Sequence, residues 1–287
     1  MRKLSLILLV AIFALSGCST DPYAEISANE EAVISVDDKE YTRGQFYEAL
    51  VSTNATALVT NKLIDMIYQE EIGDDSEIIA EVNDVIDQLK ASDESYFNLY
   101  LSYMGYTSEE AYINDMMLFS KQDALVGKYI EDNYDSMIEE YQPKMVRMLQ
   151  SSDKEAANTA LELIKDGADF KEMVATYGND NYTGEPQLIH NASTNVSGNA
   201  LLAIQSYDSA QILDAVVVNV EGTLFNVIEI VDVDPISIKE DFIASLKQDD
   251  TIISEAITSF VRAGNFTVYD KNVYEALLES NPDFLDQ

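Results

Sequence analysis

The stretch "KMVRMLQSSDKEAANTALELIKDGADFKEMVATYG", residues 144–178, decides the fold, because its hydrophobic pattern changes from that of a strand to that of two helices. "KMVRMLQ" is strand-like. "DKEAANTALELIKDG" has apolar residues at helical spacing and ends at Gly167, and "ADFKEMVATYG" repeats that pattern and ends at Gly178. Glycine is enriched just after helix C-termini. The stretch therefore predicts one strand followed by two short helices.

The residues that follow return to β structure. A loop rich in Asn, Gly, Ser and Thr covers 179–199, and "AVVVNVEGTLFNVIEIVDVDP" begins at residue 215. Two β-prone runs on either side of Glu221-Gly222 predict a hairpin. Together with residues 144–178, this order predicts a separate module over 143–234.

Helical periodicity dominates on both sides of that module. "ALVTNKLIDMIYQEEI" and "SEIIAEVNDVIDQLKA" place apolar residues three or four apart. Thr42 with Gln45, and Thr107 with Glu110, are spaced as helix-starting capping boxes. After Pro235 an apolar stripe returns, made of Phe242, Leu246, Ile252, Ile253, Ile257 and Phe260.

These patterns predict an α+β fold. A mainly helical lobe is formed by both chain ends, residues 33–142 and 235–287, and the β-α-β module of residues 143–234 is inserted between them. The stripe after Pro235 is expected to cover the apolar faces of the helices before residue 142.

The N-terminus has the features of an export signal. Arg2 and Lys3 precede the apolar run 4–15, which is too short to cross about 30 Å of hydrocarbon. Leu-Ser-Gly-Cys at residues 15–18 resembles the bacterial lipobox, in which the cysteine is acylated and becomes the new N-terminus. We expect a signal peptide over 1–17, a lipid on Cys18 and a flexible tether over 18–32. The alternative is an ordinary signal peptide with an incidental cysteine.

The charge balance restricts the possible partners. The 287 residues include 52 acidic and 17 basic residues. Such a negative field repels nucleic acid and anionic headgroups and favours basic or unfolded partners. The single histidine, His190, has no partner at ligand spacing, and no phosphate-binding loop or activated nucleophile is evident, so we expect neither a metal nor a cofactor.

Several segments, in order, resemble one family. They are the lipobox, "YTRGQFYEAL", "MGYTSEEAYINDMM", the helix pair after residue 153, and "VRAGNFTVYDKNVYEALL". The chain resembles a PrsA-type foldase lipoprotein, related to SurA-type chaperones, with a parvulin-like module in the middle. The resemblance implies a folding factor anchored by lipid on the outer face of a bacterial membrane, Gram-positive in type, with unfolded secreted proteins as partners.

The resemblance fails where isomerase chemistry would be expected. Parvulins carry histidines in the first and last strands of the module, and this chain has Arg147 and Asn226 at those positions. Strand alternation predicts that both side chains point inward. Rotation of an X-Pro bond needs no proton transfer, so activity from a rearranged site stays open. We nevertheless expect a degenerate site and a chaperone that holds unfolded chains. The alternatives are an active prolyl isomerase and an interaction lipoprotein with one fixed partner.

One aromatic run suggests where unfolded chains could bind. Tyr96, Tyr100 and Tyr103 recur on one helical face. They are either part of the core or the lining of a client-binding crevice, since tyrosine combines apolar area with a polar tip.

Overall fold

The computed structural model describes residues 28–36, 39–264 and 266–285. These residues form two compact units. The first combines residues up to 118 with those from 258 onward, and the second comprises 119–257. Both chain ends thus build the first unit, and a small antiparallel sheet lies in the second, so the predicted α+β class is confirmed.

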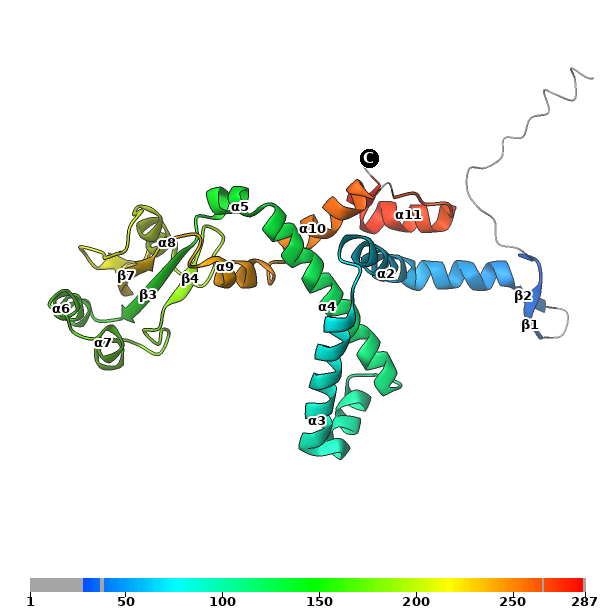
Figure 1. Ribbon diagram of the computed structural model, residues 1–287, viewed down its shortest axis with the longest axis horizontal. Coiled ribbons are helices and arrows are strands. Elements are labelled where there is room, and N and C mark those ends of the chain that lie inside the picture. The colour runs from blue at the N-terminus through cyan, green and yellow to red at the C-terminus, as the bar shows by residue number, and fades with distance from the viewer. Residues whose placement is uncertain (1–27, 37–38, 265, 286–287) are drawn as a thin grey trace, which may run out of the picture. The chain divides into compact units, whose positions relative to one another are not determined.

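The first unit is mainly helical (Figure 1). A hairpin of β1 (Ala32–Val36) and β2 (Lys39–Thr42) leads into α2 (Arg43–Glu71). The predicted capping box is present, because the Gln45 amide donates to the Thr42 hydroxyl (3.3 Å) and the Thr42 amide donates to the Gln45 side chain (3.0 Å). On the C-terminal side, α11 (Lys271–Ser280) packs against α2, and a short 3-10 turn, Pro282–Phe284, follows.

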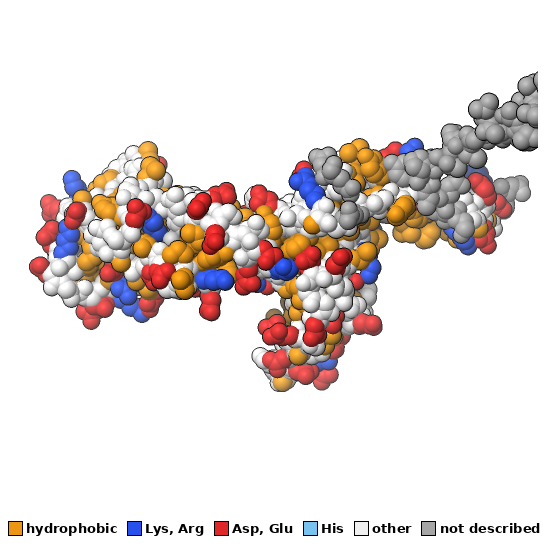
Figure 2. All heavy atoms as spheres, turned by 45° about the horizontal axis from the view of Figure 1, so that its top comes forward, with side chains coloured by type: hydrophobic (Ala, Val, Ile, Leu, Met, Phe, Trp, Pro, Cys, Tyr) orange, Lys and Arg blue, Asp and Glu red, His pale blue; other side chains and the backbone are white. Residues whose placement is uncertain are grey.

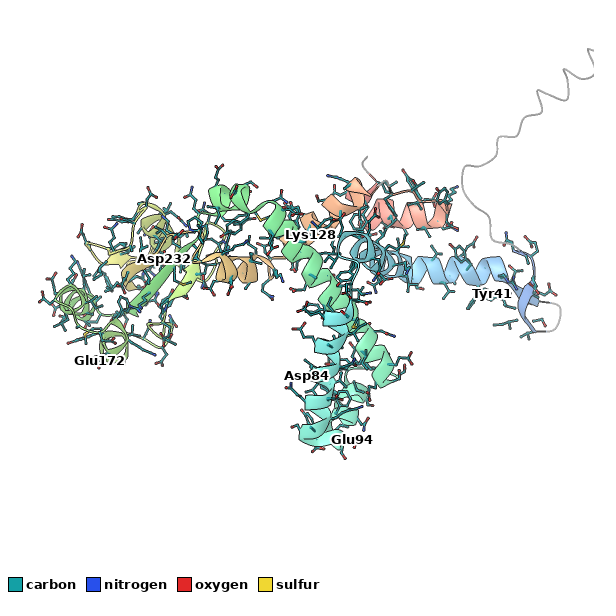
Figure 3. The ribbon with its side chains drawn as sticks, in the orientation of Figure 1. Tyr41, Asp84, Glu94, Lys128, Glu172 and Asp232 are labelled. Atoms are coloured by element: carbon teal, nitrogen blue, oxygen red, sulfur yellow. The ribbon has the colours of Figure 1, made fainter. Side chains whose placement is uncertain are left out.

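The next helix is bent, and its second half packs on the start of the helix after it, where Phe97 and Tyr100 meet Tyr112 edge-to-face. In α3 (Ser76–Tyr103) the backbone at Asp93 leaves helical geometry, with φ −165° and ψ 102°, so two helices meet there. Figure 3 labels Asp84 and Glu94, one on each side of this break. The helix α4 (Glu109–Asp132) begins after Ser108, whose hydroxyl accepts the Ala111 amide at 3.1 Å. The cap is therefore Ser108 and not the predicted Thr107.

The sheet of the second unit has the order β4-β3-β7-β5, and β6 also pairs with β7. Its centre is the antiparallel pair of the two longest strands, β3 (Lys144–Ser151) and β7 (Phe225–Asp232). The short strands are β4 (Gln187–Ile189), β5 (Gln211–Ile212) and β6 (Val217–Val218). Gly222 joins β6 to β7 with a φ of +73°, which confirms the predicted hairpin.

Helices cover both faces of this sheet. On one face α6 (Lys154–Lys165) and α7 (Phe170–Tyr177) bury a core with Leu149 and Val227. On the other face α8 (Gly198–Gln205) packs on Val146, Met148 and Ile228. Gly178 ends α7 as predicted, and a Cβ there would lie 2.6 Å from the Val174 carbonyl oxygen, so no other residue fits without movement.

The first part of the apolar stripe after Pro235 does cover helices before residue 142, as predicted, but only the end of α4 and α5 (Tyr134–Tyr141), in a third core within the second unit. Phe242 and Leu246 of α9 (Lys239–Leu246) and Ile252 of α10 (Asp250–Ala263) pack in this core. They belong to the same compact unit as the sheet and do not cover α2 or α3. Only residues from Thr258 onward return to the first unit.

No helix in the described part of the chain has both the length and the apolar character needed to span a membrane.

Candidate functional site

A buried network of amide side chains occupies the end of the central strand pair. Asn226 is 1% exposed and lies opposite Gln150 in the register of β7 and β3. The Gln150 amide donates to the Asn226 Oδ1 at 3.0 Å, and the Asn226 amide donates to the Val217 carbonyl at 3.2 Å. Asn179 and Asn181 both donate to the Gln150 Oε1, at 3.0 and 2.6 Å.

Arg147 does not join this network. It pairs with Glu229 in the strand register, and its guanidinium lies 3.1 Å from the Glu229 carboxylate. Because side chains alternate along a strand, Arg147 and Glu229 point to the face of the sheet that carries Leu149 and Val227, and away from the face covered by α8. Asn226 lies on the face of Ile228 and Ile230. The structure therefore does not bring Arg147 and Asn226 together, although the alternation argument placed both on the inside.

The chemistry available at this network is limited to hydrogen bonding. Its four side chains are neutral amides, which neither donate nor accept a proton in the physiological pH range. The side chains of Gln150 and Asn226 already have hydrogen-bond partners within the protein, so a substrate would have to break a buried hydrogen bond to use them. Sequence reasoning missed Gln150, Asn179 and Asn181. Strand register was the missing signal, because it selects the residue opposite Asn226.

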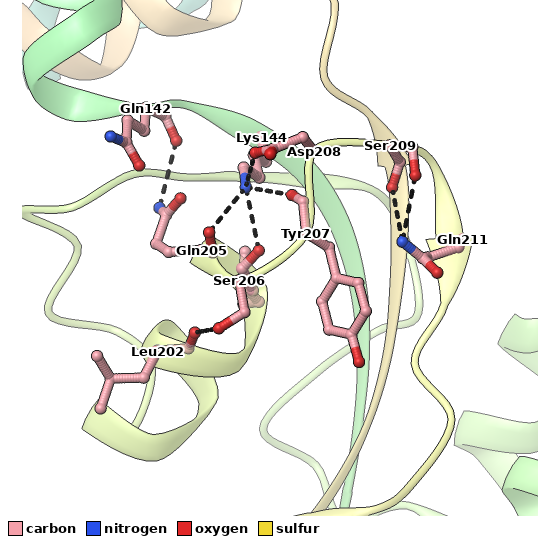
Figure 4. Close-up of polar contacts among 10 residues, drawn as sticks. Gln142, Lys144, Leu202, Gln205, Ser206, Tyr207, Asp208, Ser209 and Gln211 are labelled. Carbon is pink, nitrogen blue, oxygen red and sulfur yellow. Dashed lines mark hydrogen bonds and ion pairs between the residues drawn. The ribbon is translucent and has the colours of Figure 1, made fainter.

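A buried lysine fixes the other end of the same strand (Figure 4). The Lys144 ammonium donates to the carbonyls of Ile204 (3.2 Å) and Gln205 (3.4 Å) and also to that of Tyr207. These carbonyls lie at or just beyond the C-terminus of α8, where a cation complements the helix dipole. Burial lowers the pKa of Lys144, and Asp208 opposes that shift. We assign Lys144 to anchoring α8 and not to catalysis.

The lone histidine is buried within the third core. His190 lies edge-on to the rings of Tyr141 (5.5 Å) and Phe242 (6.1 Å), and its Nε2 is 3.2 Å from the Ser245 hydroxyl. Burial lowers the pKa of His190, and the carboxylate of Asp249 opposes the shift. These ring contacts give His190 a packing role. Among the described residues there is no group of three His, Cys, Asp or Glu side chains that could hold a metal ion.

The lowered pKa of His190 predicts a pH-dependent stability. An unfolded histidine takes up a proton as the pH falls below about 6.5, whereas the folded one resists, so the free energy of unfolding of the second unit should fall as the pH drops from 7.5 to 5.5. One group contributes at most about 1.4 kcal/mol per pH unit. Urea unfolding of the native chain and of His190→Gln at both pH values measures this contribution as the difference between their slopes. Equal slopes would contradict it.

The three predicted tyrosines are not equivalent. Tyr96 and Tyr103 are 67% and 87% exposed, and Leu99 between them is 66% exposed. Tyr100 is half-buried and meets Tyr112 edge-to-face at 6.0 Å. The core of this segment is formed instead by Phe97 and Leu101 on the opposite side of the helix. We call Tyr96, Leu99 and Tyr103 the α3 stripe, an exposed apolar surface at helical spacing i, i+3 and i+7.

A second apolar surface lies along α2. A groove of about 560 Å³ runs between α2 and the end of α10 together with the segment that follows it. Leu58 and Met66 from α2, and Tyr269 from the C-terminal segment, are among its lining residues and remain largely exposed. We call this the α2 groove. The predicted lipid attachment site, Cys18, lies outside the described residues.

Solved structures of bacterial folding factors are similar to this chain. The foldase PrsA from Streptococcus pneumoniae is 20% identical, with 86% of this chain and 98% of that one covered and a TM-score of 0.47. The peptidylprolyl isomerase PrsA from Bacillus cereus is 16% identical, with 88% and 98% covered and a TM-score of 0.47. One of the SurA-like chaperones from Campylobacter jejuni is 14% identical, with 83% and 99% covered and a TM-score of 0.27.

No family model and no curated protein matches the sequence. At low sequence identity and over most of its length, the chain is similar in structure to PrsA foldases from several bacteria and to SurA-like chaperones, the group that its sequence motifs indicate.

Proposed function

We propose that this protein holds unfolded secreted proteins on the outer face of the membrane and delays their aggregation while they fold. The observation that carries the proposal is the amount of apolar surface left exposed on the helical first unit. The α3 stripe and the α2 groove both lie in this unit, and the described part of the chain gives neither of them a cover. Figure 2 shows apolar side chains interspersed with acidic ones over the face in view.

Such surfaces have a recognised physical meaning. Exposed apolar clusters rimmed by polar groups mark sites of interaction with proteins or membranes. The acidic surface opposes contact with anionic membranes, so a protein partner is favoured. Tyrosine binds many sequences because it offers a large apolar ring with little side-chain entropy to lose. The surface is therefore suited to many unfolded partners and not to one fixed shape.

The parvulin-like module supports holding over isomerisation. The amides of Gln150, Asn226, Asn179 and Asn181 are engaged with one another, and Arg147 is engaged with Glu229. We propose that the module contributes to shape and that its isomerase site is inactive. A protease-coupled prolyl peptide assay on the full chain tests this, and catalysis lost in Asn226→Ala would establish the alternative of an active isomerase.

Holding is tested by light scattering from several unrelated denatured proteins diluted into buffer with the chain. Wild type is expected to suppress aggregation of all of them, and Tyr96→Ser/Tyr103→Ser is expected to lose most of this effect because it removes most of the α3 stripe. Both residues are largely exposed, so the variant should fold.

The matched control is Leu202→Ser/Ile236→Ser, which removes side chains that are 70% and 84% exposed in the second unit. It should hold clients like wild type. Protection of one protein alone, with no effect on the others, would favour the interaction lipoprotein with one fixed partner.

We further propose that Cys18 carries the lipid that anchors the chain. The leader core of residues 4–15 is too short to serve as a stable span. Cys18→Ala should therefore leave the protein either uncleaved or released into the medium, as read by fractionation and by the mass of the N-terminal peptide. A cleaved Cys18→Ala protein that stays in the membrane fraction would contradict the lipobox assignment.

A further inference from the structure

The first unit carries a large excess of negative charge, and most of its few basic side chains are already in ion pairs. Its described residues include 22 acidic and 6 basic side chains. Five of the six bases already lie within 4 Å of a carboxylate, in the pairs Arg43–Glu31, Lys62–Asp65, Lys90–Glu109, Arg262–Asp283 and Lys271–Glu275. Little positive charge therefore remains to neutralise the other acids.

Acidic side chains also lie beside the apolar surface. Glu70 is part of the lining of the α2 groove, and Lys62, which also lines it, is already paired with Asp65. A second depression, between α2 and α11, has a volume of about 930 Å³, and its lining includes Glu48, Glu275 and Glu279 but no lysine or arginine. Apolar contact and negative potential are thus offered by the same helix, α2, over residues 48–70.

We infer that the α2 groove binds extended protein segments in which apolar residues are flanked by lysine or arginine. This inference rests on the proposed holding function and specifies which segments are held. The apolar residues bury area in the groove, and the flanking cations meet acids of α2 and α11 outside the five ion pairs, namely Glu48, Glu70 and Glu279. A second copy of this chain would bring the same negative charge to the groove, so a cationic partner is favoured over self-association.

The direct test uses the purified full chain and three labelled twelve-residue peptides. All share one apolar centre, flanked on both sides by lysine, serine or glutamate. Fluorescence anisotropy is expected to show the lysine peptide binding about tenfold more tightly than the serine peptide at 50 mM NaCl, with the glutamate peptide weakest. The advantage of lysine should shrink severalfold at 300 mM NaCl, because salt screens exposed charges.

Two variants separate the apolar and the charged contributions. Leu58→Ser/Met66→Ser should weaken binding of the lysine and serine peptides alike, and the control Leu202→Ser/Ile236→Ser should not. The quadruple change of Glu48, Glu70, Glu275 and Glu279 to glutamine should remove most of the preference for lysine. Its control makes the same change in charge on the second unit, with Glu139→Gln, Glu162→Gln, Asp166→Asn and Asp180→Asn, and should leave the preference in place.

The outcomes distinguish this inference from the proposed function. Equal binding of lysine and glutamate peptides, with aggregation still suppressed, would overturn the charge preference and leave holding intact. Absence of both peptide binding and aggregation suppression would overturn both. A dimer that Leu58→Ser/Met66→Ser converts to a monomer, with peptide binding unchanged, would assign the groove to a second copy and overturn the inference.

Discussion

Truncation after Asp234 is expected to unfold the helical parts of both compact units and leave only the sheet module folded. It removes α9, α10 and α11 together. Phe242, Leu246 and Ile252 leave the core that they share with Val126 and Ile130. Burial of one such side chain is worth roughly 1.5–3 kcal/mol, so losing three of them approaches the whole stability of a typical domain, about 5–15 kcal/mol.

The module should survive because its two cores are made of residues within 146–233. Truncation after Ala263 is the matched comparison. It keeps α9 and α10 but removes α11, which packs on α2 and buries Leu277 completely. This shorter deletion should open the first unit alone.

Hydrogen–deuterium exchange and limited proteolysis of the two truncated chains read out these states. In the chain truncated after Asp234, protection from exchange should remain only over about 144–233, and client holding should be lost. In the chain truncated after Ala263, protection from exchange should extend over 119–257. The chain truncated after Asp234 could instead yield a protease-resistant fragment over 43–141 that still suppresses aggregation. That result would show that the first unit does not need the C-terminal residues.

Local signals in the sequence were sufficient at three places where the structure depends on neighbouring residues. The Thr42–Gln45 capping box, the end of α7 at Gly178 and the turn at Gly222 each involve residues within a few positions of one another. Their geometry follows from side-chain chemistry and backbone freedom, with little influence from distant parts of the chain. The cap of α4 is Ser108 and not Thr107. Both adjacent residues carry a hydroxyl group, so the local signal identified the cap only to within one position.

Long-range pairing was harder to predict because it depends on register. The alternation pattern placed Arg147 and Asn226 correctly within their own strands but could not say which residues stand opposite each other. The observed register pairs Asn226 with Gln150 and Arg147 with Glu229. A shift of one residue would have exchanged the faces, which is why a polar residue on a strand does not identify its partner.

The apolar stripe after Pro235 shows a second limit. Its spacing correctly predicted helices with one buried face, but spacing does not state what covers that face. Phe242 and Leu246 pack in the second unit, whereas Phe260 lines the α2 groove in the first. The division falls inside α10, at residues 257–258, where the sequence has no glycine, proline or change in periodicity.

Phe242→Ala is expected to cause a large loss of stability. Phe242 is fully buried, and its ring lies 6.1 Å from that of Tyr134, 6.2 Å from that of Tyr141 and 6.1 Å from that of His190. Removing a buried phenylalanine side chain costs about 3–5 kcal/mol, because transfer energy is lost and a cavity remains.

The same substitution at an exposed site is the control. Phe119 is 68% exposed in the same compact unit, so Phe119→Ala should change the free energy of unfolding by less than about 0.5 kcal/mol. Urea unfolding followed by near-ultraviolet circular dichroism suits this chain, since it has 17 tyrosines and no tryptophan. Equal effects of the two substitutions would mean that Phe242 is not in a core.

The single histidine gives an independent reading of the same core. Because the chain has one histidine, its imidazole gives one resolved set of proton resonances, and their pH titration reports the pKa of His190 directly. In the native chain that pKa should lie below the ordinary value near 6.5, since burial disfavours the charged ring. The cavity left by Phe242→Ala lies against the imidazole and lets water approach it, so the pKa should rise toward 6.5, whereas Phe119→Ala should leave it unchanged. If Phe242→Ala lost stability without this rise in pKa, the structural change would lie away from His190. The packing of α9 would then not depend on its contact with the histidine.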